Sequence, residues 1–276
     1  MKLGATDRFA GIATRRATLV ALAALLFLAS ARLAPADDSL NFPPTNFTIV
    51  DPASSTPLGT SRYSIESHGD RAVLRGENRY YSGLTDVETA NLELNPGADL
   101  PRLVEFDHTF YNADGSIQER AHVDLKSGHG ICIDNQGPQK SEQAAELSIP
   151  ADTWAGASVV IPIQRYLRAG EKGVLQLHAF NCAPSPKIYA ISVESDPGEA
   201  VWAQYRELAL RVEVRPDFGW FNLIVAAFVP RLHVWFDPRD GWNFVGDEAA
   251  RYYKGPPIML VKARASAPVA SARTKK

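Results

Sequence analysis

The chain has 276 residues, of which 45% are hydrophobic and 22% are charged, and its formal net charge at pH 7 is −2. A chain of this length can bury one large core, and a single β domain can reach about this size. The near balance of basic and acidic residues excludes the strongly basic class of nucleic-acid-binding proteins and leaves enzymes and binding proteins open.

The first 36 residues have the layout of a cleavable signal peptide. A basic start is followed by the apolar run Leu19–Leu28 and then by the small residues Ala29-Ser-Ala31 and Ala34-Pro-Ala36. The apolar run is about half as long as a bilayer span, which disfavours the alternative of an uncleaved anchor. We predict cleavage after Ala36 and export to the periplasm or beyond. The general secretory route is favoured, although Arg15-Arg16 resembles part of a twin-arginine signal.

Removal of residues 1–36 leaves 24 basic and 30 acidic residues, a net charge near −6. We therefore expect a soluble mature chain with no nucleic-acid partner and no transmembrane span. Its two cysteines, Cys132 and Cys182, form an even pair in an oxidising compartment. They predict a disulfide that closes a loop of about 50 residues, with two separate thiols as the alternative.

Turns and alternating segments dominate the first half of the mature chain. Residues 37–59, rich in Pro, Ser, Thr and Asn, predict an extended lead-in. Later segments alternate apolar and polar residues between turn signals, which predicts antiparallel strands joined by hairpins. These segments flank the turns at Ser67–Asp70, Pro96-Gly97, Asn112–Gly115 and Ser127-Gly128.

One helix is predicted in the second half, over Ser158–Ala169, with Pro162 keeping it short or marking its first turn. Further strands are predicted over 174–180, 188–193, 208–214, 231–236, 242–245 and 258–261. Residues 265–276 predict a disordered tail.

About ten to twelve strands and one short helix predict an all-β, mainly antiparallel fold. We expect a single β-rich domain over residues 60–264, built as a strongly curved sheet or an open barrel. A β-sandwich is the alternative, because the order of the strands cannot be derived from these patterns.

The second half resembles exported bacterial β-rich proteins that are classed as a domain of unknown function. The resemblance lies in Asp152 before the helix that carries Arg165, in Gly170, in the Leu- and Val-rich strand at 207–214, and in the segment Val229-Pro-Arg-Leu-His-Val-Trp-Phe-Asp237. It covers about residues 150–261. It implies a periplasmic curved β-sheet of uncharacterised function, and it supplies no catalytic residues.

A group of histidines and acids between residues 107 and 134 is the best candidate for chemistry. If the turn at Asp114-Gly115 is tight, Asp107 lies opposite His122, with Asp124 further along the same face. Such a pair can form an acid–base couple, so the candidate catalytic residues are Asp107, His108, His122 and Asp124. The alternative is a polar strand face with no catalytic role. We predict no metal site, because no known ligand spacing is present.

The apolar run 218–229 and the nearby tryptophans are the second candidate. The ordinary explanation is a buried strand or a helix packed on the sheet. The functional alternative is an apolar groove, with Trp220, Phe221, Trp235 and Trp242 as its candidate ligand-binding residues.

Together these features predict a non-enzymatic periplasmic protein that binds or carries an apolar ligand in the cell envelope. An apolar small molecule or an envelope component is the expected partner, and no cofactor is predicted. The alternatives are an exported hydrolase that uses the His–Asp group, and an envelope scaffold that docks through residues 218–236.

Overall fold

A computed structural model of the chain describes residues 40, 44–94, 100–136, 140–182, 185–196, 210–217, 232–251 and 255–263. All but residue 40 belong to the compact unit Asn41–Lys276. The predicted signal peptide, the apolar run 218–229 and the predicted tail lie outside the described residues.

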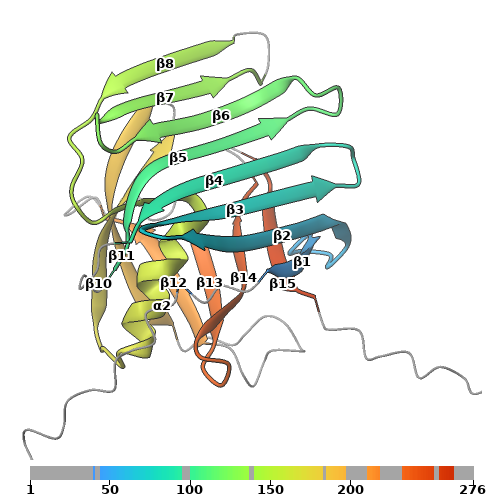
Figure 1. Cartoon of the computed structure of the whole chain (residues 1–276). Helices are drawn as coiled ribbons and strands as arrows, with labels where there is room; N and C mark the ends of the chain where they lie inside the picture. The colour runs from blue at the N-terminus through green and yellow to red at the C-terminus, as the bar shows by residue number, and fades with distance from the viewer. Residues whose placement is uncertain are drawn as a thin grey trace, which may run out of the picture. The chain divides into compact units, whose positions relative to one another are not determined.

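The described residues form one sheet of fifteen strands, shown in Figure 1. The sheet is accompanied by a short 3-10 helix, η1 (Gly156–Val159), which continues into α2 (Val160–Arg168). The strands are β1 (Thr45–Val50), β2 (Pro57–His68), β3 (Arg71–Tyr80), β4 (Thr85–Glu93), β5 (Arg102–Tyr111), β6 (Ile117–Asp124), β7 (His129–Asp134), β8 (Ser141–Glu146), β9 (Thr153–Ala155), β10 (Val174–Cys182), β11 (Pro186–Asp196), β12 (Leu210–Pro216), β13 (Leu232–Asp237), β14 (Asn243–Ala250) and β15 (Pro257–Lys262).

The strand order is simple: β1 to β8 form one meander, β10 to β15 form a second, and the pairing of β1 with β15 joins them. All pairs are antiparallel except β9 with β10. The predicted all-β, mainly antiparallel fold with one short α-helix is confirmed. The strands form one continuous, unclosed sheet with β8 and β9 at its ends, and not the two separate sheets of the β-sandwich alternative. It also has more strands than the ten to twelve predicted.

The sheet curls so that its two halves face each other (Figure 1). The ring of Phe106 on β5 lies 6.4 Å from that of Phe180 on β10. Cys132 on β7 is bonded to Cys182 on β10, with their Cα atoms 5.7 Å apart, which confirms the predicted disulfide. We call the side on which these residues meet the inner face, and the opposite side of the sheet the outer face.

Alternating side chains explain why the strands form where they do. On β3, Ala72, Leu74, Asn78 and Tyr80 are buried while their neighbours in the chain are more exposed. The turns predicted at Ser67–Asp70, Asn112–Gly115 and Ser127-Gly128 are present, whereas Pro96-Gly97 lies outside the described residues. Gly115 adopts a φ of 82°, a conformation that glycine takes without steric cost.

The prediction of an extended lead-in over residues 37–59 has to be corrected. Thr45–Val50 forms β1, which lies in the middle of the sheet between β2 and β15, and Pro57 begins β2. This strand places only Phe47 and Ile49 in the core, and so short an alternation is hard to recognise among Pro, Ser and Thr residues.

The predicted helix over Ser158–Ala169 is present as η1 followed by α2. Pro162 lies in the first turn of α2, where its missing N–H leaves no hydrogen bond unmade. No helix among the described residues combines the length and apolar character that crossing a membrane requires.

Candidate functional site

The predicted His–Asp group on β5 and β6 is divided between the two faces of the sheet. Asp107 lies opposite His122 in the β5–β6 register, as predicted. The turn spans Asn112–Ser116 and is longer than the assumed two residues, and a bulge at Phe110/Tyr111 restores the register. His108 follows Asp107 in the chain and faces inward, because successive side chains of a strand alternate. The four predicted residues therefore do not form one site.

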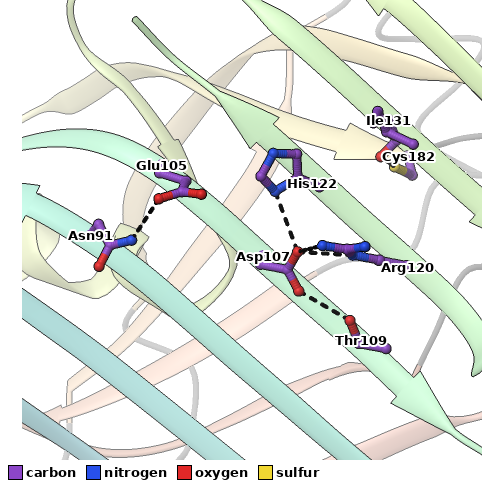
Figure 2. A network of polar contacts seen from close by, with 8 residues as sticks. All are labelled: Asn91, Glu105, Asp107, Thr109, Arg120, His122, Ile131 and Cys182. Atoms are coloured by element: carbon purple, nitrogen blue, oxygen red, sulfur yellow. Dashed lines mark hydrogen bonds and ion pairs between the residues drawn. The ribbon is translucent and has the colours of Figure 1, made fainter.

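Asp107 is the centre of an outer-face network that Figure 2 shows. Its Oδ2 accepts hydrogen bonds from Nε and Nη2 of Arg120, at 2.9 and 2.6 Å. Its Oδ1 accepts one from the hydroxyl of Thr109 at 3.0 Å. Nδ1 of His122 lies 3.3 Å from Oδ2, an ion-pair distance without hydrogen-bond alignment. The carboxylate is thus held chiefly by Arg120.

Asp124 has a different role, because its carboxylate organises the β6–β7 turn. It accepts hydrogen bonds from the backbone N–H of Lys126 at 2.8 Å and from the hydroxyl of Ser127 at 2.9 Å. The Lys126 N–H lowers the pKa of Asp124, followed by the Ser127 hydroxyl. Within the described ranges, no group of three or more His, Cys, Asp or Glu side chains is arranged to hold a metal ion.

The inner face carries a polar cluster that the sequence analysis did not predict. We call Asp86, Glu88, His108 and Asp247 the inner polar cluster. His108 Nε2 lies 2.6 Å from Asp86 Oδ1, and Asn78 Nδ2 donates to Asp86 Oδ2 at 2.9 Å. Glu88 lies opposite His108 in the β4–β5 register. Asp86 and Glu88 are only 6% and 7% exposed.

Burial and charge shift the titration of this cluster. Burial raises the pKa of Glu88 to about 7, although the charge of His108 partly opposes this. Burial also raises the pKa of Asp247 to about 7 against a hydrogen bond from the backbone of Leu260. For His108, burial favours the neutral form, but the Asp86 carboxylate outweighs it and the pKa rises to about 9. Of the three acids, Asp86 is the one that forms an ion pair with His108, and burial raises the pKa of the other two.

The helix element completes the cluster and ties it to the second meander. The backbone N–H of Ala157 in η1 donates to Glu88 Oε1 at 2.7 Å. Further along α2, Gln164 Nε2 donates to the carbonyl of Trp242 at 2.9 Å, and Arg168 Nε to that of Gly241 at 2.7 Å. The helix element thus runs from β4 in one half of the sheet to the β13–β14 turn in the other.

We expect Gly156→Ala to destabilise the fold through this contact. Gly156 has a φ of 50°, and a Cβ there would lie 2.6 Å from Glu88 Oε1 and 2.7 Å from the Phe106 ring. Urea unfolding should show a loss of at least about 2 kcal/mol. Gly170→Ala is the matched control: its φ is 67° with nothing within 4 Å of the added atom, so only about 1 kcal/mol of backbone strain is expected. Equal losses in both variants would contradict the packing argument.

Aromatic rings from both halves flank the inner polar cluster. Phe47 on β1 and Phe244 on β14 have ring centroids 5.3 Å apart, and Phe244 also contacts Phe236 at 6.4 Å. Tyr80 and Phe110 lie 5.9 Å apart on the first meander. The inner face therefore carries aromatic rings as well as the inner polar cluster, and the Phe106 ring lies 6.4 Å from that of His108.

The predicted ligand-binding residues are only partly described. Trp220 and Phe221 lie outside the described residues. Trp235 is fully buried in a small apolar cluster with Val245 and Met259, as the core-filling explanation expects. Trp242 is half-buried in the β13–β14 turn, at a φ of 60°. A role for these residues in ligand binding stays a prediction.

One signal in the sequence could have revealed the inner polar cluster. On β4, Asp86 and Glu88 share the alternation of Ala90 and Leu92, both of which are buried. Carboxylates in register with core residues mark a polar patch inside a protein. Val87 favoured the opposite assignment, because an apolar residue is expected inward, yet it is 37% exposed.

A protein of known structure has a fold similar to that of this chain. It is a β-barrel-like protein of the domain of unknown function DUF1849 from Brucella abortus, with 10% sequence identity and a TM-score of 0.42. The match covers 80% of this chain and 94% of that protein. Like the group that the sequence resembles, it is a bacterial β-rich protein of unknown function. No family model and no curated protein matches the sequence.

Proposed function

We propose that this is an exported, non-enzymatic protein of the cell envelope that binds or carries an apolar ligand against its inner face. The observation that carries the proposal is the meeting of aromatic rings from both halves of one curled sheet, as in the Phe47–Phe244 and Phe106–Phe180 contacts. The ligand would lie on the inner face between the two halves of this sheet, which the Cys132–Cys182 bond holds together.

Two features support the proposed export to the cell envelope. The basic start, apolar run and small-residue sites of residues 1–36 are those of a signal peptide. The Cys132–Cys182 bond is of a kind that persists in the periplasm or outside the cell and is rare in the cytoplasm.

The export proposal makes a direct prediction. Expressed with its own N-terminus in a bacterium, the protein should be recovered from the periplasmic fraction with Asp37 as its first residue. The double variant Leu25→Arg/Leu26→Arg interrupts the apolar run and should leave the full-length chain in the cytoplasm. Intact-mass measurement of both fractions checks this. An uncleaved wild-type chain in the cytoplasm would contradict it.

The hydrolase alternative gains no support from the outer face. Catalysis by a His–Asp pair needs a nucleophile or a water held by the free ring nitrogen of the histidine. The nearby hydroxyl of Thr109 donates to Asp107, and Asp107 is committed to Arg120. This geometry suits a network that stabilises the β5–β6 pair.

Equilibrium dialysis with dodecan-1-ol tests the binding role. The wild type should bind the alcohol saturably, and Phe106→Ala and Phe180→Ala should each weaken binding about tenfold, because each removes an aromatic contact on the inner face. Val87→Ala is the control, since Val87 is exposed on the outer face, and its affinity should stay within about twofold of wild type. No saturable binding by the wild type after removal of bound lipid would overturn the proposal.

A further inference from the structure

The β14–β15 turn places a charged side chain over two aromatic rings of the other meander. The guanidinium carbon of Arg251 lies 3.7 Å from the ring centroid of Tyr80 and 5.4 Å from that of Phe110. Both rings are buried, at 5% and 1% exposure. This cation–π contact holds the guanidinium against the two rings.

Two side-chain donors of Arg251 are unused within the part of the chain that the structure describes. Its Nε and Nη2 atoms are buried and have no hydrogen-bond partner among the described residues. These two atoms form one edge of the guanidinium, and their N–H bonds point the same way, which matches the two oxygens of a carboxylate. A buried charge without a hydrogen-bonded counter-ion is costly, so this edge is set up to receive one.

Further unpartnered polar groups lie beside the same rings. The hydroxyls of Tyr80 and Ser61 are buried without a partner among the described residues. Asn78, opposite Ser61 in the β2–β3 register, precedes Tyr80 by two positions on the same face of β3. Asp86 of the inner polar cluster is already paired with His108 and Asn78. Nε and Nη2 of Arg251 form no hydrogen bond with a carboxylate among the described residues.

We propose that Arg251 is a carboxylate-binding residue, and that the ligand of the inner face is an amphiphile with a carboxylate head and an apolar chain. The head would be bound by Nε and Nη2 of Arg251, with the hydroxyls of Tyr80 and Ser61 as further donors. The chain would lie among the aromatic rings. The choice of an apolar chain rests on the proposed function, whereas the carboxylate site rests on Arg251 alone.

Dialysis with a matched pair of probes tests the head-group preference. The wild type should bind dodecanoate at least about tenfold more tightly than dodecan-1-ol, the gain of a charge-assisted bidentate contact. Arg251→Gln should abolish that preference and leave affinity for the alcohol within about twofold. Arg251→Lys keeps the charge without the paired donors and should retain only part of the preference. Arg239→Gln, whose side chain is 60% exposed, is the control and should change neither affinity.

A short carboxylate separates the two proposals. Butanoate has too little chain to need the aromatic rings, and it should raise the melting temperature of the wild type but not that of Arg251→Gln. No butanoate effect on the wild type, or an equal effect on both proteins, would overturn the carboxylate site even if dodecan-1-ol binds. A butanoate effect confined to the wild type, with no dodecan-1-ol binding, would uphold the site and overturn the apolar-ligand proposal. Equal loss of both long probes in Arg251→Gln would mean a purely structural role.

Discussion

At about pH 8, Glu88→Gln is expected to be more stable than the wild type by about 1–3 kcal/mol. Burial raises the pKa of Glu88 from 4.5 to about 7, so above that pH the folded protein must hold an ionised carboxylate in a buried site. The amide is neutral at every pH, and its oxygen can still accept the Ala157 N–H. The gain should vanish below about pH 4, where the carboxyl is largely protonated in both the folded and the unfolded chain.

The inner polar cluster gives the wild type an unusual pH profile. A raised carboxyl pKa means that stability is lost as pH rises from the unfolded value to about 7, for Glu88 and equally for Asp247. His108, with a pKa raised to about 9, stabilises the fold fully below pH 6.5, and this contribution is lost as pH rises through 9. All three groups act in the same direction, so the free energy of unfolding should fall from mildly acidic to alkaline pH.

Urea unfolding at a series of pH values measures both effects. Glu93→Gln is the control, because Glu93 pairs with Lys126 at the surface, and it should shift stability by less than about 0.5 kcal/mol. Two results would contradict the burial of Glu88. One is a wild type whose free energy of unfolding is highest above about pH 8. The other is a Glu88→Gln variant that is less stable than the wild type by the same amount at alkaline and at acidic pH.

Loss of the disulfide is expected to have the largest effect of any single change. In the Cys132→Ser/Cys182→Ser variant, the free energy of unfolding should fall by about 4 kcal/mol, because the bond closes a long loop in the unfolded chain. The two cysteines are separated by 50 residues. The bond also joins β7 to β10, so the variant should weaken dodecan-1-ol binding by loosening the two halves of the curled sheet.

The reductant dependence provides the check on the disulfide. Dithiothreitol should lower the stability of the wild type to that of the double variant and should leave the variant itself unchanged. The unreduced wild type should have no free thiol when it is unfolded in urea. Two free thiols in that measurement, or a stability that the reductant does not change, would mean that the bond does not form and that the prediction is wrong.

Much of this fold follows from local patterns. The short helix was predicted over Ser158–Ala169 with Pro162 near its start, and it lies there as η1 and α2. The pairing of Asp107 with His122 was also predicted, although its register is set by a longer turn and a bulge and not by a two-residue turn. Pairs that join distant parts of the chain did not follow, because period-two alternation identifies a strand but not its neighbour. The pairing of β1 with β15 is the main example.

The candidate site was harder to predict for a physical reason. Asp86, Glu88 and His108 meet through the β4–β5 pairing, whereas Asp247 and Arg251 come from the second meander and reach this site because the sheet curls. The histidine group near residue 107 is compact in sequence, yet strand alternation directs His108 to Asp86 and away from Asp107. Arg251 carries no motif, and its role depends on the two rings beneath it.

Photo-crosslinking with a diazirine-bearing long-chain alcohol tests the central claim most directly. If the inner face holds the ligand, mass spectrometry of the irradiated protein should find the label on inner-face residues such as Phe47, Phe106, Phe180 and Phe244. An excess of unlabelled dodecan-1-ol should remove it. Label confined to the outer face, or label that the competitor does not reduce, would contradict the proposal that the inner face of the curled sheet binds an apolar ligand.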